Sequence, residues 1–140
     1  MSARLLEGRP AIVTGAAGGI GRGHVLHLAQ AGAQVVINDI HGEAATALAD
    51  EVTAAGGTAL VSTHDIGTRA GAEALIQACI DAFGSVGILI NNAGNLRDRT
   101  LLKMTDEDLD SILTVHVKGT FWCTQAAARA MVEQGTGGAI

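Results

Sequence analysis

The sequence predicts an α/β fold in which a parallel sheet carries helices on both faces. Short apolar runs, such as residues 11–13 and 86–90, alternate along the chain with longer amphipathic stretches. Runs that are apolar throughout are typical of strands buried on both faces of a parallel sheet. A glycine-rich turn follows the first run, where a strand would lead into a helix.

Each element has its own local signal, and the elements are expected in the following order: strand 11–13, helix 19–31, strand 34–38, helix 42–55, strand 59–62, a helix ending at residue 83, strand 86–90, and a long helix from 106 towards 133. Glycines at 32, 56 and 84 end the first three helices. Thr105, with Asp108 three residues on, resembles a capping box and opens the long helix. Residues 137–140 are expected to begin a fifth strand.

Right-handed crossovers place these strands in the order 3-2-1-4, with the fifth strand just beginning. This is the Rossmann-type doubly wound sheet, and residues 1–140 are expected to form one such domain, truncated at the start of its fifth strand. The fourth strand is then expected to leave unpaired backbone at an edge.

Composition excludes several classes of partner. The chain is 48% hydrophobic and 16% charged, as in globular proteins, and its net charge of −5 comes without a basic cluster, so nucleic acid is not expected as a partner. No apolar stretch approaches the ~20 residues of a membrane span. Residues 1–7 do not read as a secretory signal, and Cys79 and Cys123 lack metal-ligand spacing. We therefore expect free thiols, no metal and a cytoplasmic protein.

The glycine-rich turn has the spacing T-G-x-x-x-G-x-G, from Thr14 to Gly21. A strand that enters a helix through glycines presents unpaired amides and the positive end of the helix dipole to a dinucleotide pyrophosphate. Gly15 would permit the sharp exit from the strand, Gly19 the approach of the phosphates, and Gly21 tight packing of the helix on the strand. The alternative is a plain turn.

Asp39 ends the second strand, 18 positions after Gly21. A carboxylate at this point accepts hydrogen bonds from an adenosine ribose and repels a 2′-phosphate, and neither Ala17 nor Ile40 supplies a cation. The site is therefore expected to prefer NAD over NADP. The alternative is that Asp39 caps the helix that begins near Gly42.

Polar residues also follow the third and fourth strands. Asp65 would lie within reach of an adenine amino group, or else be a solvated loop acid. Asn91 and Asn92 would tie adjacent strand ends and let Gly94 pass close to the cofactor.

His116 lies seven positions after Leu109, on the apolar stripe of the long helix, and is expected to face inward. Such a histidine could relay protons, or be a satisfied core residue. Residues 97–99 (RDR) would line a substrate entrance or form a solvated loop.

Together these motifs resemble the short-chain dehydrogenase/reductase family over the whole chain. The resemblance implies an NAD(P)-dependent oxidoreductase that interconverts secondary alcohols and ketones. It assigns roles by position: at the pyrophosphate Thr14, Gly15, Gly19, Ile20 and Gly21, at the ribose Asp39, at the adenine Asp65 and Ile66, and as braces of the site Asn91, Asn92, Ala93 and Gly94. It also implies a homodimer or homotetramer.

His116 stands where the family usually has a catalytic asparagine. This substitution, with residues 96–99 and 105–108, is similar to the hydroxyacyl-CoA dehydrogenase part of multifunctional β-oxidation enzymes, which implies an acyl-CoA-like substrate and a place for His116 in a proton relay.

The chain departs from the family pattern in its acid/base chemistry. The resemblance implies a Ser, a Tyr and a Lys beyond the fifth strand, and this sequence contains no tyrosine. The 140 residues are therefore expected to bind NAD without transferring hydride on their own. The rival interpretation is a non-catalytic nucleotide-binding or subunit-pairing module.

Overall fold

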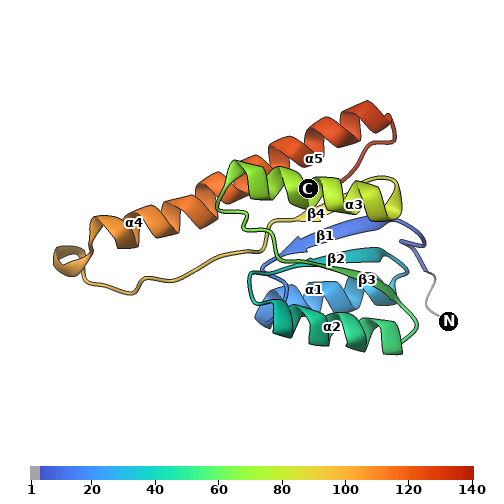
Figure 1. Ribbon diagram of the computed structural model, residues 1–140, viewed down its shortest axis with the longest axis horizontal. Coiled ribbons are helices and arrows are strands. Elements are labelled where there is room, and N and C mark those ends of the chain that lie inside the picture. Colours follow the sequence, from blue (N-terminus) through green and yellow to red (C-terminus); the bar gives the residue numbers. More distant parts are fainter. Residues whose placement is uncertain (1–3) are drawn as a thin grey trace.

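The chain folds as a parallel α/β sandwich, as the sequence predicts. A computed structural model describes residues 4–140 (Figure 1). Residues 1–3 lie outside the described residues, although they belong to the predicted domain and to the stretch tested for a secretory signal. The sheet has the order β3-β2-β1-β4, and every neighbouring pair is parallel. Its strands are β1 (Pro10–Thr14), β2 (Gln34–Asn38), β3 (Thr58–Ser62) and β4 (Ile88–Ile90).

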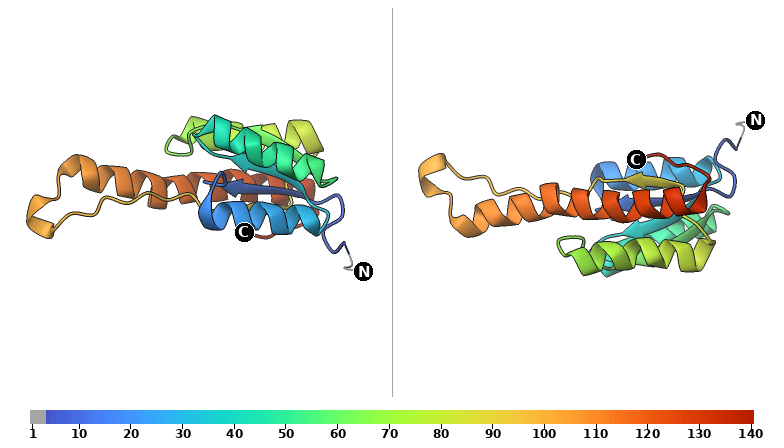
Figure 2. Two further views of the ribbon diagram at one scale, coloured as in Figure 1. Left: turned by 90° about the horizontal axis from the view of Figure 1, so that it is seen from below. Right: turned by 90° about the horizontal axis from the view of Figure 1, so that it is seen from above.

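Helices cover both faces of the sheet (Figures 1 and 2). The helices α1 (Gly19–Gln30) and α2 (Gly42–Ala54) lie on one face, and α3 (Arg69–Phe83) and α5 (Thr120–Gln134) lie on the other. Alternate side chains of β1 enter opposite cores: Ala11 and Val13 pack with α1 and α2, whereas Ile12 packs with α3 and α5. The strands are apolar throughout because both of their faces are buried.

The fifth strand begins with one residue. Ala139 forms a parallel bridge with Ile88, in which Leu89 N–H donates to the Ala139 carbonyl (2.9 Å) and Ala139 N–H donates to the Gly87 carbonyl (3.0 Å). The predicted start of a fifth strand is therefore confirmed, and this bridge pairs the edge of β4 at Ile88. The predicted strand over residues 86–90 is shorter than expected, because only Ile88–Ile90 pair with β1.

The predicted long helix consists of three segments. They are α4 (Asp106–Leu113), a π-helical segment η2 (Thr114–Gly119) and α5. With the preceding loop and the short helix η1 (Leu101–Lys103), α4 extends away from the sheet (Figures 1 and 2). We call residues 95–113 the arm. None of the helices in the described part of the chain is long and apolar enough to cross a membrane.

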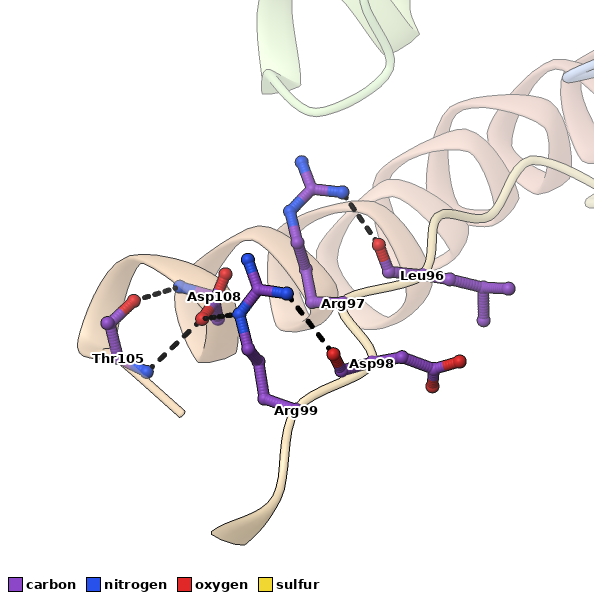
Figure 3. Close-up of polar contacts among 6 residues, drawn as sticks. All are labelled: Leu96, Arg97, Asp98, Arg99, Thr105 and Asp108. Carbon is purple, nitrogen blue, oxygen red and sulfur yellow. Dashed lines mark hydrogen bonds and ion pairs between the residues drawn. The ribbon is translucent and has the colours of Figure 1, made fainter. Parts of the chain in front are cut away.

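The predicted capping box at the start of α4 is confirmed (Figure 3). Asp108 N–H donates to Thr105 Oγ1 (3.1 Å), and Thr105 N–H donates to Asp108 Oδ2 (3.2 Å). This backbone hydrogen bond from Thr105 holds the pKa of the Asp108 carboxyl below its usual value. Local hydrogen bonding therefore starts α4 although none of its residues, all of them described, is buried.

Candidate functional site

The glycine-rich turn adopts a geometry that side chains would prevent. Gly15 and Gly19 have positive φ angles of 59° and 55°. A Cβ on Gly15 would lie 2.7 Å from Ala93 Cα, and a Cβ on Gly21 would lie 2.5 Å from Asn92 Nδ2. A Cβ on Gly19 would meet no atom within 4 Å, so this side of the turn is open. The turn is thus packed tightly against the end of β4 and open at the start of α1.

The amides at the start of α1 face no side-chain acceptor. The N-cap residue is Gly18, which makes no side-chain cap, and the first turn of α1 carries no acidic residue. Ile20, in the same turn, is 76% exposed. Free amides and an uncompensated helix dipole favour an anion at this end of the helix.

Thr14 and Asn92 join the turn to the end of β4. Thr14 Oγ1 accepts hydrogen bonds from the backbone N–H groups of Asn92 and Ala93, both at 3.0 Å. Asn92 Nδ2 donates to the carbonyls of Thr14 (3.0 Å) and Gly15 (2.9 Å). Asn91 Nδ2 donates instead to Thr124 Oγ1 on α5 (3.0 Å). Asn92 therefore ties adjacent strand ends, as the sequence predicts, whereas Asn91 ties the end of β4 to α5.

Asp39 connects the glycine-rich turn to the loop after β2. Its Oδ2 accepts from Ala17 N–H (3.0 Å), and its Oδ1 accepts from His41 N–H (2.9 Å). The N-cap of α2 is His41, so the alternative in which Asp39 caps that helix is not what the structure shows. The half-buried carboxylate is held at the carboxyl end of β2.

A cavity of about 380 Å³ lies at the carboxyl ends of the strands. Its lining brings together many of the predicted site residues: Gly15, Asp39, Asp65, Ile66, Asn92, Ala93 and Gly94. The other lining residues are Asn38, Ile40, His41, His64, Asn95, Arg97 and Val115. Thr14, Gly19, Ile20, Gly21, Asn91 and His116 are not part of this lining. Ligands of doubly wound sheets bind at this edge.

Asp65 and Ile66 line the cavity from the loop after β3. The exposed Asp65 carboxylate accepts a hydrogen bond from Gly67 N–H through Oδ1 (2.8 Å). Ile66 is 7% exposed, and its Cδ1 fills the space where a side chain on Gly119 would lie. Asp65 is therefore both a loop acid and a member of the cavity wall.

The prediction that His116 faces inward is wrong. Its side chain is exposed, and so are the apolar residues used to place it on a buried stripe, such as Leu109 (47%) and Val117 (58%). The stripe is not a buried one, because α4 extends away from the sheet and none of its described residues is buried, so counting with a period of 3.6 from Leu109 does not lead to a core position. Gly119 is the buried residue of this segment.

Asn95 is a residue that the sequence analysis missed. Its backbone N–H and carbonyl both contact His116 Nε2, its Nδ2 donates to Ser111 Oγ (2.7 Å), and its buried Oδ1 has no hydrogen-bond partner in the described part of the chain. The sequence signal that could have indicated it is its position, directly after residues 91–94 at the carboxyl end of the fourth predicted strand.

Arg97 and Arg99 point to the same side of the loop in Figure 3. Arg97 lines the cavity and donates to the Leu96 carbonyl (2.7 Å). Arg99 donates to the Asp98 carbonyl (3.2 Å) and lies 3.6 Å from Asp108 Oδ2. Arg97 thus fits the predicted entrance, whereas Arg99 belongs to the solvated loop.

Neither cysteine is placed for nucleophilic chemistry. Burial raises the pKa of the Cys79 thiol to about 12 and that of the Cys123 thiol to about 11. Among residues 4–140 there is no group of His, Cys, Asp and Glu side chains arranged to hold a metal ion.

The sheet order, the glycine-rich turn and the cavity place the chain in the class of Rossmann-type α/β proteins. Within that class it belongs to the short chain dehydrogenase family, whose sequence profile matches residues 9–140. The chain is 44% identical over 128 residues to the (2S)-[(R)-hydroxy(phenyl)methyl]succinyl-CoA dehydrogenase subunit BbsD of Thauera aromatica, a match that covers 91% of this chain and 52% of that protein.

Other relatives confirm the resemblance to multifunctional enzymes. The chain is 44% identical to the peroxisomal multifunctional enzyme type 2 of Drosophila melanogaster, over 94% of this chain and 23% of that protein. A short-chain type dehydrogenase/reductase from Mycobacterium marinum has a solved structure with a TM-score of 0.93 and 37% identity, covering 99% of this chain and 57% of that one. The chain spans about half the length of the BbsD subunit of Thauera aromatica.

Proposed function

We propose that these residues form the NAD(H)-binding part of an oxidoreductase that interconverts secondary alcohols and ketones. The observation that carries the proposal is the cavity at the strand ends, whose lining includes both Gly15 and Asp39. The open space at Gly19 and the free amides of α1 fit a pyrophosphate beside it. Bound NAD would supply a hydride acceptor at this edge of the sheet.

Each predicted residue has a proposed task. The backbone that faces the pyrophosphate is that of Gly15, Gly19, Ile20 and Gly21. Thr14 fixes this turn to the end of β4. Asp39 accepts hydrogen bonds from the adenosine ribose, and Asp65 and Ile66 border the adenine. Residues 92–94 form the wall on the nicotinamide side, and Asn91 braces it through Thr124. The negative charge of Asp39 favours NAD over NADP, because it repels a 2′-phosphate.

The proposed substrate is an acyl-CoA-like secondary alcohol or its ketone. The names of two relatives support this class: the (2S)-[(R)-hydroxy(phenyl)methyl]succinyl-CoA dehydrogenase subunit from Thauera and the hydroxyacyl-CoA dehydrogenase ChsB1 of Mycobacterium tuberculosis, which is 40% identical. We propose that the 140 residues bind dinucleotide but do not transfer hydride alone, because they contain no tyrosine to serve as the acid/base. His116 would take part in a proton relay through the loop at Asn95, which it contacts.

One observation favours a second candidate function, the pairing of subunits. Val117, Phe121 and Val132 are 58%, 55% and 80% exposed along η2 and α5, and the first two line a groove of about 590 Å³. Such a surface would join copies of the chain into a homodimer or homotetramer.

Two buried free cysteines suit a reducing cytoplasm, where we place the protein.

The proposal is tested by titrating the chain with NADH and NADPH while following the fluorescence of Trp122 and the melting temperature. We expect NADH to bind at least about tenfold more tightly than NADPH, and the difference to shrink in Asp39→Asn. Equal affinities, or no binding of NADH to a chain with native circular dichroism, would contradict it. Light scattering of the same samples tests the pairing function separately.

A further inference from the structure

A single ring nitrogen of His116 faces both backbone groups of Asn95. Nε2 lies 3.0 Å from the Asn95 nitrogen and 2.8 Å from the Asn95 carbonyl oxygen. The first contact requires Nε2 to accept a hydrogen bond, and the second requires it to donate one, so the two bonds exclude each other. In every protonation state of the ring, one of the two Asn95 groups is left without this partner.

The ring is held in this position by the chain around it. A Cβ on Gly94 would lie 2.7 Å from His116 Cε1, so the backbone passes directly against the ring. The π-helical segment presents the imidazole to the loop, and Asn95 Nδ2 fixes the same loop to Ser111. Ala93, Gly94 and Asn95 line the cavity, so the contact with His116 sets the position of the cavity wall.

We propose that His116 is a positioning residue that holds the Asn95 peptide groups in one of two arrangements, selected by the protonation of its ring. The neutral ring with its proton on Nδ1 accepts from Asn95 N–H. The imidazolium donates from Nε2 to the Asn95 carbonyl. An asparagine side chain carries a donor and an acceptor and would bond both groups at once, so the exchange is specific to histidine.

Charged neighbours do not compete for Nε2. The groove that His116 lines with Val117 and Phe121 contains no other titratable side chain. Asp65 and Arg97 line the cavity on the side of Asn95, and Lys118 follows on η2, but in residues 4–140 no hydrogen bond joins any of them to the ring. Asn95 therefore remains the hydrogen-bond partner of the ring nitrogen.

Nuclear magnetic resonance of the whole chain, labelled with ¹⁵N and ¹³C, tests the exchange directly. We expect the amide proton and the carbonyl carbon of Asn95 to shift as the His116 ring titrates, and the ring nitrogens to report the Nδ1–H tautomer at high pH. In His116→Asn both Asn95 signals should stay constant with pH. The matched control His27→Asn, at an exposed position on α1, should leave the pH dependence of the Asn95 signals unchanged.

The consequence for ligand binding rests on the proposed function. We expect the dissociation constant of NADH to change about fivefold across the His116 titration in the wild type, and to be independent of pH in His116→Asn. Asn95 signals that do not respond to the titration, or an Nε2–H tautomer at every pH, would overturn the inference. If the Asn95 signals shift as the His116 ring titrates while NADH fails to bind, the inference stands and the proposed dinucleotide function fails.

Discussion

The body of the molecule and its arm both contain leucines but are stabilised in different ways. In the body, meaning the sheet with α1, α2, α3 and α5, side chains such as Ile12 and Leu75 are completely buried. In the arm, Leu101 and Leu102 are 88% and 96% exposed. The body is therefore held by burial of apolar surface, whereas α4 relies on its capping box and helix propensity. The same residue type has different consequences in the two regions.

The largest expected difference is between two leucine substitutions. Leu75→Ala in the body removes a completely buried side chain from the α3 core and should lower the free energy of unfolding by about 2–5 kcal/mol. Leu102→Ala in the arm should change it by less than about 0.5 kcal/mol. Urea unfolding followed by circular dichroism measures both values. Equal losses would show that the arm is packed in solution.

A threonine pair sharpens the comparison at the level of hydrogen bonds. Thr14→Val leaves the N–H groups of Asn92 and Ala93 without their acceptor and should cost about 1–3 kcal/mol of global stability. Thr105→Val removes only the cap of α4, worth about 1 kcal/mol, and should fray that helix locally. Amide hydrogen exchange separates the two effects, because Thr14→Val should raise exchange throughout the sheet. A purely local effect of Thr14→Val would mean that the turn is not joined to the body as described.

The smallest expected effect is the response of the arm to acid. Because the folded pKa of Asp108 is lowered, its contribution to stability is fully present above the usual value of 3.8 and is lost as the pH falls through the folded pKa. We expect the amide of Thr105 to lose its hydrogen bond in this range while the sheet remains folded. In Asp108→Asn this pH dependence should vanish, as proton exchange rates of Thr105 would report. Unfolding of arm and sheet at the same pH would contradict the separation of the two regions.

Local sequence signals predict the elements that depend on nearby residues. The glycine-rich turn, the end of α3 at Gly84 and the capping box at Thr105 follow from patterns within a few residues of each other, and the structure confirms them. The strand order follows from the right-handed crossovers that join these elements, and it is confirmed too. The gathering of Gly15, Asp39 and Asp65 around one cavity also follows, because parallel strands bring their carboxyl ends to one edge.

Contacts between distant residues lie beyond such patterns. The sequence predicts a regular helix through His116, but the structure contains a π-helical turn there, with Gly119 buried against Ile66. His116 lies in that turn and contacts Asn95, 21 positions earlier in the chain, a partner that no pattern within the helix predicts.

From its sequence alone, this chain is identified as a Rossmann-type member of the short chain dehydrogenase family, with a glycine-rich turn after its first strand and a carboxylate at the end of β2. Only the tertiary structure decides that Asp39 accepts hydrogen bonds from Ala17 in the turn and from His41 before α2, and that His116 contacts the backbone of Asn95. The physical reason is that hydrophobic period and capping act within one element, whereas these side chains find their partners only after separate elements have packed.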